Sequence, residues 1–253
     1  MAVEWSREVV TGRGEPLLFD TTVPSCARIY DYWLGGKDNF AVDRAAGDKA
    51  LRAYPDIGVS ARANRTFLAR AVRFLAGEAR IRQFLDIGTG IPTGNNTHEV
   101  AQFVAPESRV VYVDNDPFVL SHARALLASK PEGVTEYVEA DLRDPQKIVN
   151  TSARLLDFER PIAVMLMTIL QHIDDEDDPA KDIDAESMAK MAERLNRILP
   201  ESITLRTGPE VATFFDGLEL VPPGMVRASK WRPVNETEAA GPAALWAGVA
   251  GKN

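Results

Sequence analysis

The sequence has little cysteine and no long apolar run. Its only cysteine is Cys26, so no disulfide can form within the chain and a reducing compartment is expected. No stretch approaches the roughly 18 consecutive apolar residues of a membrane-spanning helix. The first residues, MAVEWSREVV, have neither the basic end nor the apolar run of a signal peptide. These features predict a cytoplasmic protein.

Basic residues are fewer than acidic ones. The net charge of −8 argues against non-specific electrostatic binding of nucleic acid. No Ser-His-Asp arrangement, G-x-S-x-G elbow, G-x-x-x-x-G-K-[ST] phosphate loop or C-x-x-C pair stands out. The acidic run DDEDDP, residues 174–179, lacks the spaced glycine and terminal glutamate of a calcium loop, so no metal is predicted. The expected partner is a small molecule, with no nucleic acid and no membrane.

Short apolar runs alternate with helical segments after a mostly helical beginning. Residues 1–23 are expected to form a loose lead-in, because Gly12, Gly14 and Pro16 break any pattern. Four candidate strands, RQFLDI, RVVYVD, VTEYVEAD and PIAVMLMTI, alternate with helical patterns, which predicts a parallel sheet. SITLRT is a further short strand or turn, and ALWAGVAGK predicts a last, antiparallel strand. We therefore predict an α/β sheet domain, residues 81–253, with a helical N-terminal extension, residues 1–80, in one structural unit.

A glycine turn in FLDIGTGIPTGNNTHEVA follows the first strand. Gly88 and Gly90 lack a Cβ and let the backbone approach a ligand at the carboxyl ends of the strands. Asp86 precedes the turn, and Asp141 ends the third strand. Asp114 ends the second strand, 24 residues after Gly90, where an acidic side chain can take both ribose hydroxyls. The pattern predicts a site for a nucleoside-containing cofactor.

The residues of the turn discriminate between cofactors. A dinucleotide turn has a third glycine and presents N–H groups to a pyrophosphate, whereas Pro92 or Thr93 stands here and Asp86 adds negative charge. S-adenosylmethionine has an ammonium, a sulfonium and a ribose diol but no phosphate, so the carboxylates fit it better. Two alternatives stay open: a nicotinamide-dependent oxidoreductase, and a cofactor-binding module without catalysis.

Six blocks carry a resemblance to a known family. ARIYDYWLGGKDNFAVD, FLDIGTGIPTGNNTHEVAQ, VVYVDNDPFVLSHARALL, EADLRDP, DDEDDP and FFDGLELVPPGMV resemble the signature blocks of the actinobacterial S-adenosyl methyltransferase family, long described as a domain of unknown function. The resemblance implies the class I Rossmann-like methyltransferase fold, S-adenosyl-L-methionine as cofactor, and methyl transfer to a small molecule.

The same resemblance assigns the cofactor residues. Asp86, Gly88 and Gly90 would line the methionine part. Asp114, with Asn115 beside it, would hold the ribose, and Asp141 with Leu142 would flank the adenine. In one respect the sequence departs from the family, because a helix and a buried strand are expected between DDEDDP and AESMAKMAERL. Either SITLRT substitutes for that strand or the segment is absent.

Candidates for catalysis are few, because methyl transfer depends mainly on positioning. His172 follows the fourth strand and is a candidate base for a protonated acceptor, or else it bonds to the acidic loop beside it. His98 favours a packing or capping role, and His122 a solvated helix position. Arginines 62, 65, 70 and 73 are expected to form a solvated face.

An aromatic and polar cluster surrounds the turn in YDYWLGGKDN. Glycines beside aromatic residues suit a lid that closes over a cofactor, and aromatic faces attract a sulfonium. We expect this lid to comprise Tyr30, Asp31, Gly36, Lys37 and Asn39, with Tyr30 as a second candidate catalytic residue. The alternative is a helix that packs its aromatic side chains on the core.

Overall fold

The computed structural model describes residues 8–10, 16–126, 129–172, 185–199 and 203–252. The chain forms two compact units, and each combines two separate segments. The sheet unit comprises Met1–Arg28 and Val72–Met167, and the second unit comprises Ile29–Ala71 and Thr168–Asn253. The expected division at residue 80 therefore differs from the observed one, since the C-terminal third of the chain packs with the early helices.

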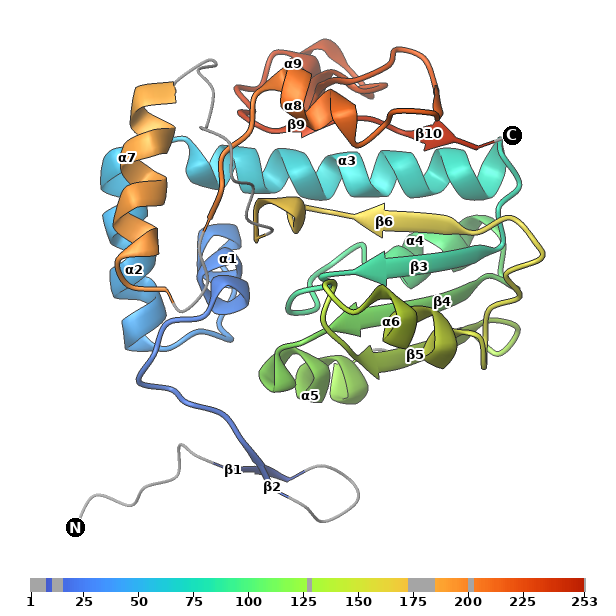
Figure 1. The fold of residues 1–253 in the computed structure, drawn as a ribbon, viewed down its shortest axis with the longest axis horizontal. Coiled ribbons are helices and arrows are strands. Elements are labelled where there is room, and N and C mark those ends of the chain that lie inside the picture. The colour runs from blue at the N-terminus through green and yellow to red at the C-terminus, as the bar shows by residue number, and fades with distance from the viewer. Residues whose placement is uncertain (1–7, 11–15, 127–128, 173–184, 200–202, 253) are drawn as a thin grey trace. The chain divides into compact units, whose positions relative to one another are not determined.

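A four-stranded parallel sheet forms the centre of the sheet unit. It consists of β3 (Gln83–Ile87), β4 (Arg109–Asp114), β5 (Val134–Glu139) and β6 (Ala163–Leu166). The order is β5-β4-β3-β6, and all four arrows in Figure 1 point the same way. The four strands expected from the sequence and their parallel pairing are confirmed.

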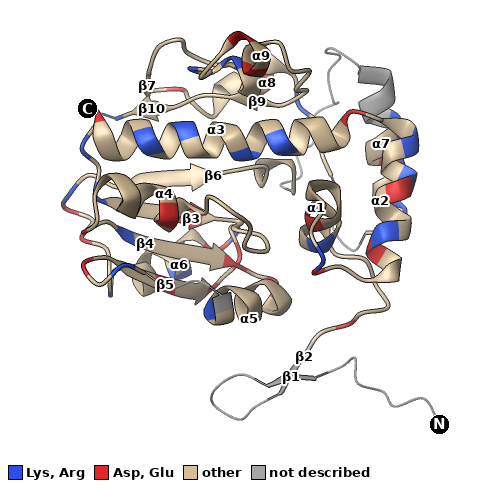
Figure 2. Cartoon of the chain, turned by 180° about the vertical axis from the view of Figure 1, so that it is seen from behind, with Lys and Arg blue, Asp and Glu red and all other residues tan. Residues whose placement is uncertain are grey.

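Helices cover both faces of this sheet, as parallel strands require. They are α4 (Thr97–Val104), α5 (Pro117–Leu126) and α6 (Pro145–Ser152). Figures 1 and 2 show α4 on one face and α6 on the other. On the α6 face the buried cluster includes Leu85, Val111, Val138 and Ile148. Because side chains alternate along a strand, Asp86 and Tyr112 project toward the α4 face.

The N-terminal lead-in contains more structure than expected. Strands β1 (Glu8–Val10) and β2 (Pro16–Leu18) pair as an antiparallel ladder, so the prediction of a loose lead-in without a regular pattern is wrong there. Each strand has three residues, too few for an alternating apolar pattern to predict it from the sequence. Further along, the Phe19 ring packs edge-on against Phe118 of α5, with centroids 4.7 Å apart.

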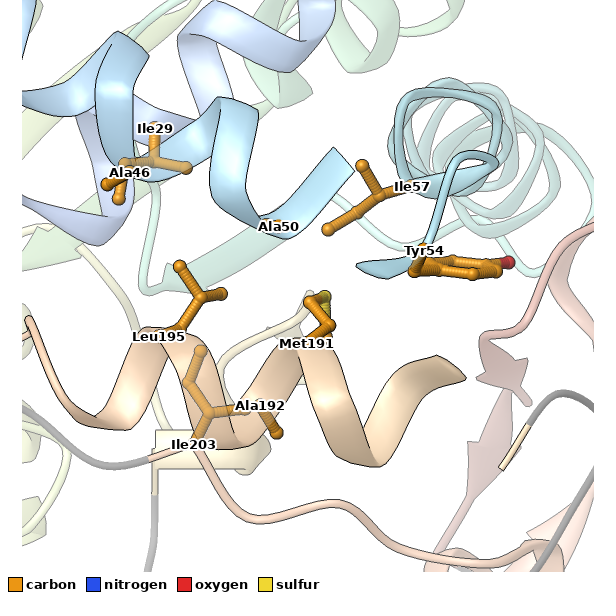
Figure 3. Packing of buried hydrophobic residues seen from close by; sticks show 9 residues of the cluster. All are labelled: Ile29, Ala46, Ala50, Tyr54, Ile57, Met191, Ala192, Leu195 and Ile203. Carbon is orange, nitrogen blue, oxygen red and sulfur yellow. The ribbon is translucent and has the colours of Figure 1, made fainter. Parts of the chain in front are cut away.

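The second unit has a core built from both of its segments. Helix α2 (Ala41–Ala53) packs with α7 (Ala185–Asn196). Helix α1 (Cys26–Leu34) begins in the sheet unit and ends in this one, and α3 (Ile57–Gly77) begins in this unit and ends in the sheet unit. Figure 3 shows Met191 and Leu195 of α7 turned toward Ala50 and Ile29. Burial of these apolar side chains explains why residues far apart in sequence share one unit.

The C-terminal region consists of short elements. They are η1 (Leu170–His172), α8 (Gly208–Thr213), β7 (Glu219–Leu220), β8 (Val226–Arg227), η2 (Ala228–Lys230), α9 (Glu236–Ala239), β9 (Trp246–Ala247) and β10 (Ala250–Gly251). Strand β10 pairs antiparallel with β7, and β9 with β8, in ladders separate from the parallel sheet. Residues 203–206 of SITLRT form no strand, so they do not supply the expected fifth strand.

One arginine of α3 departs from the expected solvated face. Basic residues recur along α3 in Figure 2, and Arg62 and Arg73 are exposed. Arg70, however, is buried, and its guanidinium donates to the carbonyls of Trp231 (2.7 Å) and Ala228 (2.6 Å) and to the Glu238 carboxylate. The prediction was wrong for Arg70 because its acceptors lie more than 150 residues away in sequence.

Among the helices that the structure describes, none is both long enough and apolar enough to span a membrane. Within the same described ranges, no group of three or more His, Cys, Asp or Glu side chains is arranged to hold a metal ion. The acidic run DDEDDP lies outside the described residues.

Candidate functional site

The carboxyl ends of β3, β4 and β5 bring the sequence-predicted acidic residues to one edge of the sheet. Asp86 lies one residue before the end of β3, and Asp114 is the last residue of β4. Asp141 follows β5 by two residues. The parallel register pairs Ile87 with Val113, so the turn after β3 begins beside the end of β4.

The glycine turn adopts a conformation that requires glycine. Gly88 has φ +74° and Gly90 has φ +66°, in the left-handed region that L side chains rarely enter. The N–H groups of Gly88 and Thr89 donate to the Val113 carbonyl, at 2.9 and 3.3 Å, which ties the turn to β4. A Cβ added at Gly90 would meet no atom within 4 Å. Open space therefore lies directly beside the backbone of the turn.

Asp114 joins the ends of two strands. Its Oδ2 accepts the Gly90 N–H at 2.9 Å, and its Oδ1 accepts the Asp116 N–H at 3.0 Å. Burial raises the pKa of Asp114 to about 6, although these two N–H groups oppose the rise. A carboxylate oxygen has two acceptor sites, so each oxygen can still accept a hydroxyl proton. Asp114 can therefore accept hydrogen bonds from two further donors.

A hydrogen bond from helix α4 holds the Asp86 side chain. Its side chain is 4% exposed, and its Oδ2 accepts the hydroxyl proton of Thr97, the first residue of α4, at 2.6 Å. A negative group placed here favours a cationic ligand and repels a phosphate.

Asn115 directly follows β4 and Asp141 follows β5, at the same carboxyl-end edge of the sheet. Asn115 Nδ2 donates to Asp141 Oδ2 at 3.2 Å. Arg143 donates to Asp141 from its backbone N (2.8 Å), Nε (2.8 Å) and Nη2 (2.6 Å), and its side chain holds the pKa of Asp141 well below the ordinary value. Leu142 packs partly buried against the core on the α6 face. Asn115 and Arg143 thus hold the Asp141 carboxylate between them.

The predicted lid residues belong to the second unit. Tyr30 Oη donates to the Ala61 carbonyl at 3.1 Å and accepts from Asn64 Nδ2 at 3.0 Å, and burial raises the Tyr30 pKa. Asp31 is buried, and its Oδ2 accepts from the Asp38 N–H (3.0 Å).

Gly35 and Gly36 end helix α1, and their N–H groups donate to carbonyls of the last turn. Gly35, with φ +83°, donates its N–H to the Tyr32 carbonyl at 3.0 Å. Asn39 Nδ2 donates to Asp31 Oδ2 at 2.8 Å, and a Cβ at Gly36 would overlap the same carboxylate. Lys37 is exposed. The segment therefore has a defined conformation with an exposed tip.

The three histidines have different surroundings. His172 is half-buried in η1 and belongs to the second unit, whereas the acidic edge belongs to the sheet unit. His98 is buried against Tyr112, which confirms a packing role. His122 is half-buried, and its ring packs on Phe118 with centroids 4.2 Å apart, so the prediction of a solvated position is wrong.

Two polar residues at this edge were not identified from the sequence. Thr97 contacts Asp86, and Asp116 accepts both the Phe118 N–H (2.9 Å) and the Ser25 hydroxyl (2.9 Å). The D-x-D spacing of Asp114 and Asp116 before a proline at the start of a helix was an available signal for the second contact. No comparable signal marks Thr97.

Comparisons with known proteins agree with this geometry. A family model described as S-adenosyl methyltransferase matches residues 14–194 and 180–253. The chain is similar to the crystal structure of a DUF574 family protein from Streptomyces avermitilis MA-4680, with 43% identity and a TM-score of 0.85, covering 92% of this chain and 99% of that one. No curated protein matches the chain.

A second crystal structure is that of a protein from Thermobifida fusca YX proposed to be a methyltransferase. It is 41% identical, with a TM-score of 0.80, and the match covers 92% of this chain and 97% of that one. The predicted Rossmann-like α/β fold is confirmed, and a methyltransferase is favoured over the nicotinamide-dependent alternative.

Proposed function

The chain belongs to the S-adenosyl methyltransferase family and is a methyltransferase that uses S-adenosyl-L-methionine, and on this premise we propose which residues bind the cofactor. The site is the acidic edge of the sheet unit. Asp86, Gly88 and Gly90 line the methionine part, Asp114 with Asn115 holds the ribose, and Asp141 with Leu142 flanks the adenine.

The observation that carries this proposal is the contact between Asp114 and the glycine turn. One carboxylate spans the ends of β3 and β4, and each oxygen keeps an acceptor site for a ribose hydroxyl. The open space beside Gly90 leaves room for a ligand against the backbone. Carboxylates at Asp86 and Asp114 suit a cofactor with a diol and positive charges. The residues present therefore fit this group.

The cofactor supplies an activated methyl group, so the protein has mainly to hold the acceptor in line and exclude water. We propose that residues 30–39 form the lid, with Tyr30, Asp31, Gly36, Lys37 and Asn39 facing the bound molecules. His172 takes a proton from an acceptor that carries one, and Tyr30 is the second candidate for direct participation. Tyr30 would have to exchange its bond to the Ala61 carbonyl for one to the acceptor.

The acceptor that we propose is a small molecule. The net charge of −8 offers no general attraction for nucleic acid. A location in the cytoplasm is consistent with the lone cysteine.

Calorimetric titration tests the cofactor site. We expect S-adenosylhomocysteine to bind and NAD to give no heat with the same protein. Tight NAD binding without binding of S-adenosylhomocysteine would overturn the assignment. For catalysis, His172→Asn should lower kcat and flatten its pH dependence, with cofactor affinity unchanged, whereas His122→Asn should change neither.

A further inference from the structure

Thr97 makes a buried hydrogen bond with an acidic residue of the proposed site. The Thr97 side chain is 1% exposed, and its hydroxyl lies 2.6 Å from Asp86 Oδ2. The Thr97 Oγ1 also lies 3.9 Å from the Met165 Sδ, but a carboxylate is a far stronger acceptor than a thioether. The hydroxyl proton is therefore given to Asp86, which restricts how that carboxylate is turned.

The neighbouring residue anchors the same turn of α4 to the next strand. The His98 backbone N–H donates to Tyr112 Oη at 2.8 Å, and Tyr112 Oη also lies 2.8 Å from His98 Nδ1. The tyrosine hydroxyl accepts the backbone proton and forms a second hydrogen bond with Nδ1, whose donor is set by the imidazole tautomer. The first turn of α4 is thus bonded to β3 through Thr97 and to β4 through His98.

The charge of Asp86 acts within this buried layer. Burial raises the pKa of Tyr112 well above the ordinary value, and the negative charge of Asp86 raises it further. In such surroundings charges are weakly screened, so a small reorientation of the carboxylate changes its attraction for a cation.

We propose that Thr97 is a positioning residue for the cofactor: its hydroxyl holds the Asp86 carboxylate in the orientation that receives the ammonium group of the methionine part. The inference rests on the proposed function, in which Asp86 lines that part of the site. It assigns Thr97 to the amino acid portion of the cofactor, whereas Asp114 serves the ribose.

Comparing two ligands measures the contribution of the amino acid portion to binding. S-adenosylhomocysteine carries the amino acid group, whereas 5′-methylthioadenosine has the same adenosine and sulfur without it. Thr97→Val keeps the shape of the side chain and removes the hydroxyl. We expect it to weaken S-adenosylhomocysteine binding roughly tenfold, the loss of one hydrogen bond to a charged group, and to leave methylthioadenosine within about twofold. Thr97→Ser should restore wild-type affinity for both.

Tyr112→Phe is the matched control. It breaks the adjacent anchor of α4 without touching Asp86, so it should lower thermal stability without separating the two ligands. If Thr97→Val weakens both ligands equally or neither, or if Tyr112→Phe produces the same separation, Thr97 acts only through packing and the proposal fails. Should Thr97→Val not fold, Thr97→Ala is measured in the same way.

Asp86→Asn distinguishes failure of this inference from failure of the proposed function. If Asp86→Asn weakens S-adenosylhomocysteine but not methylthioadenosine while Thr97→Val does not, only the role of Thr97 is overturned. If Asp86→Asn does not separate the ligands, Asp86 does not serve the methionine part, and the inference on Thr97 falls together with the proposed role of Asp86.

Discussion

The carboxylate at the end of β4 accepts a backbone proton from the glycine turn after β3, with Asp114 Oδ2 2.9 Å from Gly90 N. This contact ties the glycine turn after β3 to the end of β4, so the two proposed cofactor-binding segments are directly bonded. Burial raises the pKa of Asp114, the proposed ribose ligand, to about 6.

The raised pKa of Asp114 predicts pH-dependent cofactor binding. Ribose hydroxyls donate to the ionised carboxylate, so affinity should fall as pH drops through about 6. At pH 5 about one molecule in ten is ionised, which would weaken S-adenosylhomocysteine by up to about tenfold relative to pH 8. Titrations of wild type and Asp114→Asn at both pH values check this. A variant with the same pH dependence as wild type would assign the titration to another group.

Removal of the Asp114 side chain should cost cofactor affinity. Asp114→Ala is expected to weaken S-adenosylhomocysteine by about 1.5–3 kcal/mol, the range for hydrogen bonds to a charged group. Glu139→Ala is the control, because Glu139 pairs with Asp114 in the sheet register but is exposed. It should change the affinity by less than about 0.5 kcal/mol. Unchanged binding in a folded Asp114→Ala would remove the ribose assignment.

A side chain at Gly88 should damage the site more than loss of Asp114. At φ +74° a branched side chain is strained by at least about 1–2 kcal/mol, and it would also occupy the approach of the ligand. We expect Gly88→Val to abolish measurable S-adenosylhomocysteine binding. Gly94→Ala lies in the same loop, where an added Cβ meets nothing within 4 Å, and it should bind normally. Normal binding by Gly88→Val would show that the turn is not the site.

Arg70 should stabilise the second unit. Its removal takes away the guanidinium hydrogen bonds to the carbonyls of Trp231 and Ala228 and to one oxygen of Glu238, so Arg70→Met should lower the free energy of unfolding by about 2–4 kcal/mol. Arg62→Met, at an exposed position of the same helix, should change it by less than about 0.5 kcal/mol. Urea unfolding of both variants gives the comparison. Equal midpoints would mean that the buried guanidinium contributes no net stability.

The contrast between Asp114 and Arg70 indicates what the sequence could predict. Asp114 was identified because strand ends are local features: an apolar run stops at an acid, and parallel strands bring such ends together. The burial of Arg70 depends on carbonyls 158 and 161 residues further along the chain, and no local pattern encodes them. Thr97 was missed for a related reason, since its contact with Asp86 follows from how α4 sits on β3.

The C-terminal strands show a second limit. Each of β7 to β10 has two residues, too few for an alternating pattern to distinguish an edge strand from a turn. Antiparallel pairing at the chain's end was expected, but its partners were not, because they are chosen by tertiary packing.

The proposed lid predicts a change in hydrogen exchange at residues 28–40. Gly35, Gly36 and Lys37 are exposed, whereas Asp31 behind them is buried and bonded to the Asp38 N–H. A hinge that closes on a ligand exchanges quickly when free and slowly when closed. Peptides covering this segment should therefore gain protection when S-adenosylhomocysteine is added. Peptides of α2, residues 41–53, are the reference and should exchange equally with and without ligand. If residues 28–40 exchange slowly in both states, the bonds of Asp31 make the segment a fixed helix end, and Tyr30 and Lys37 lose their proposed roles.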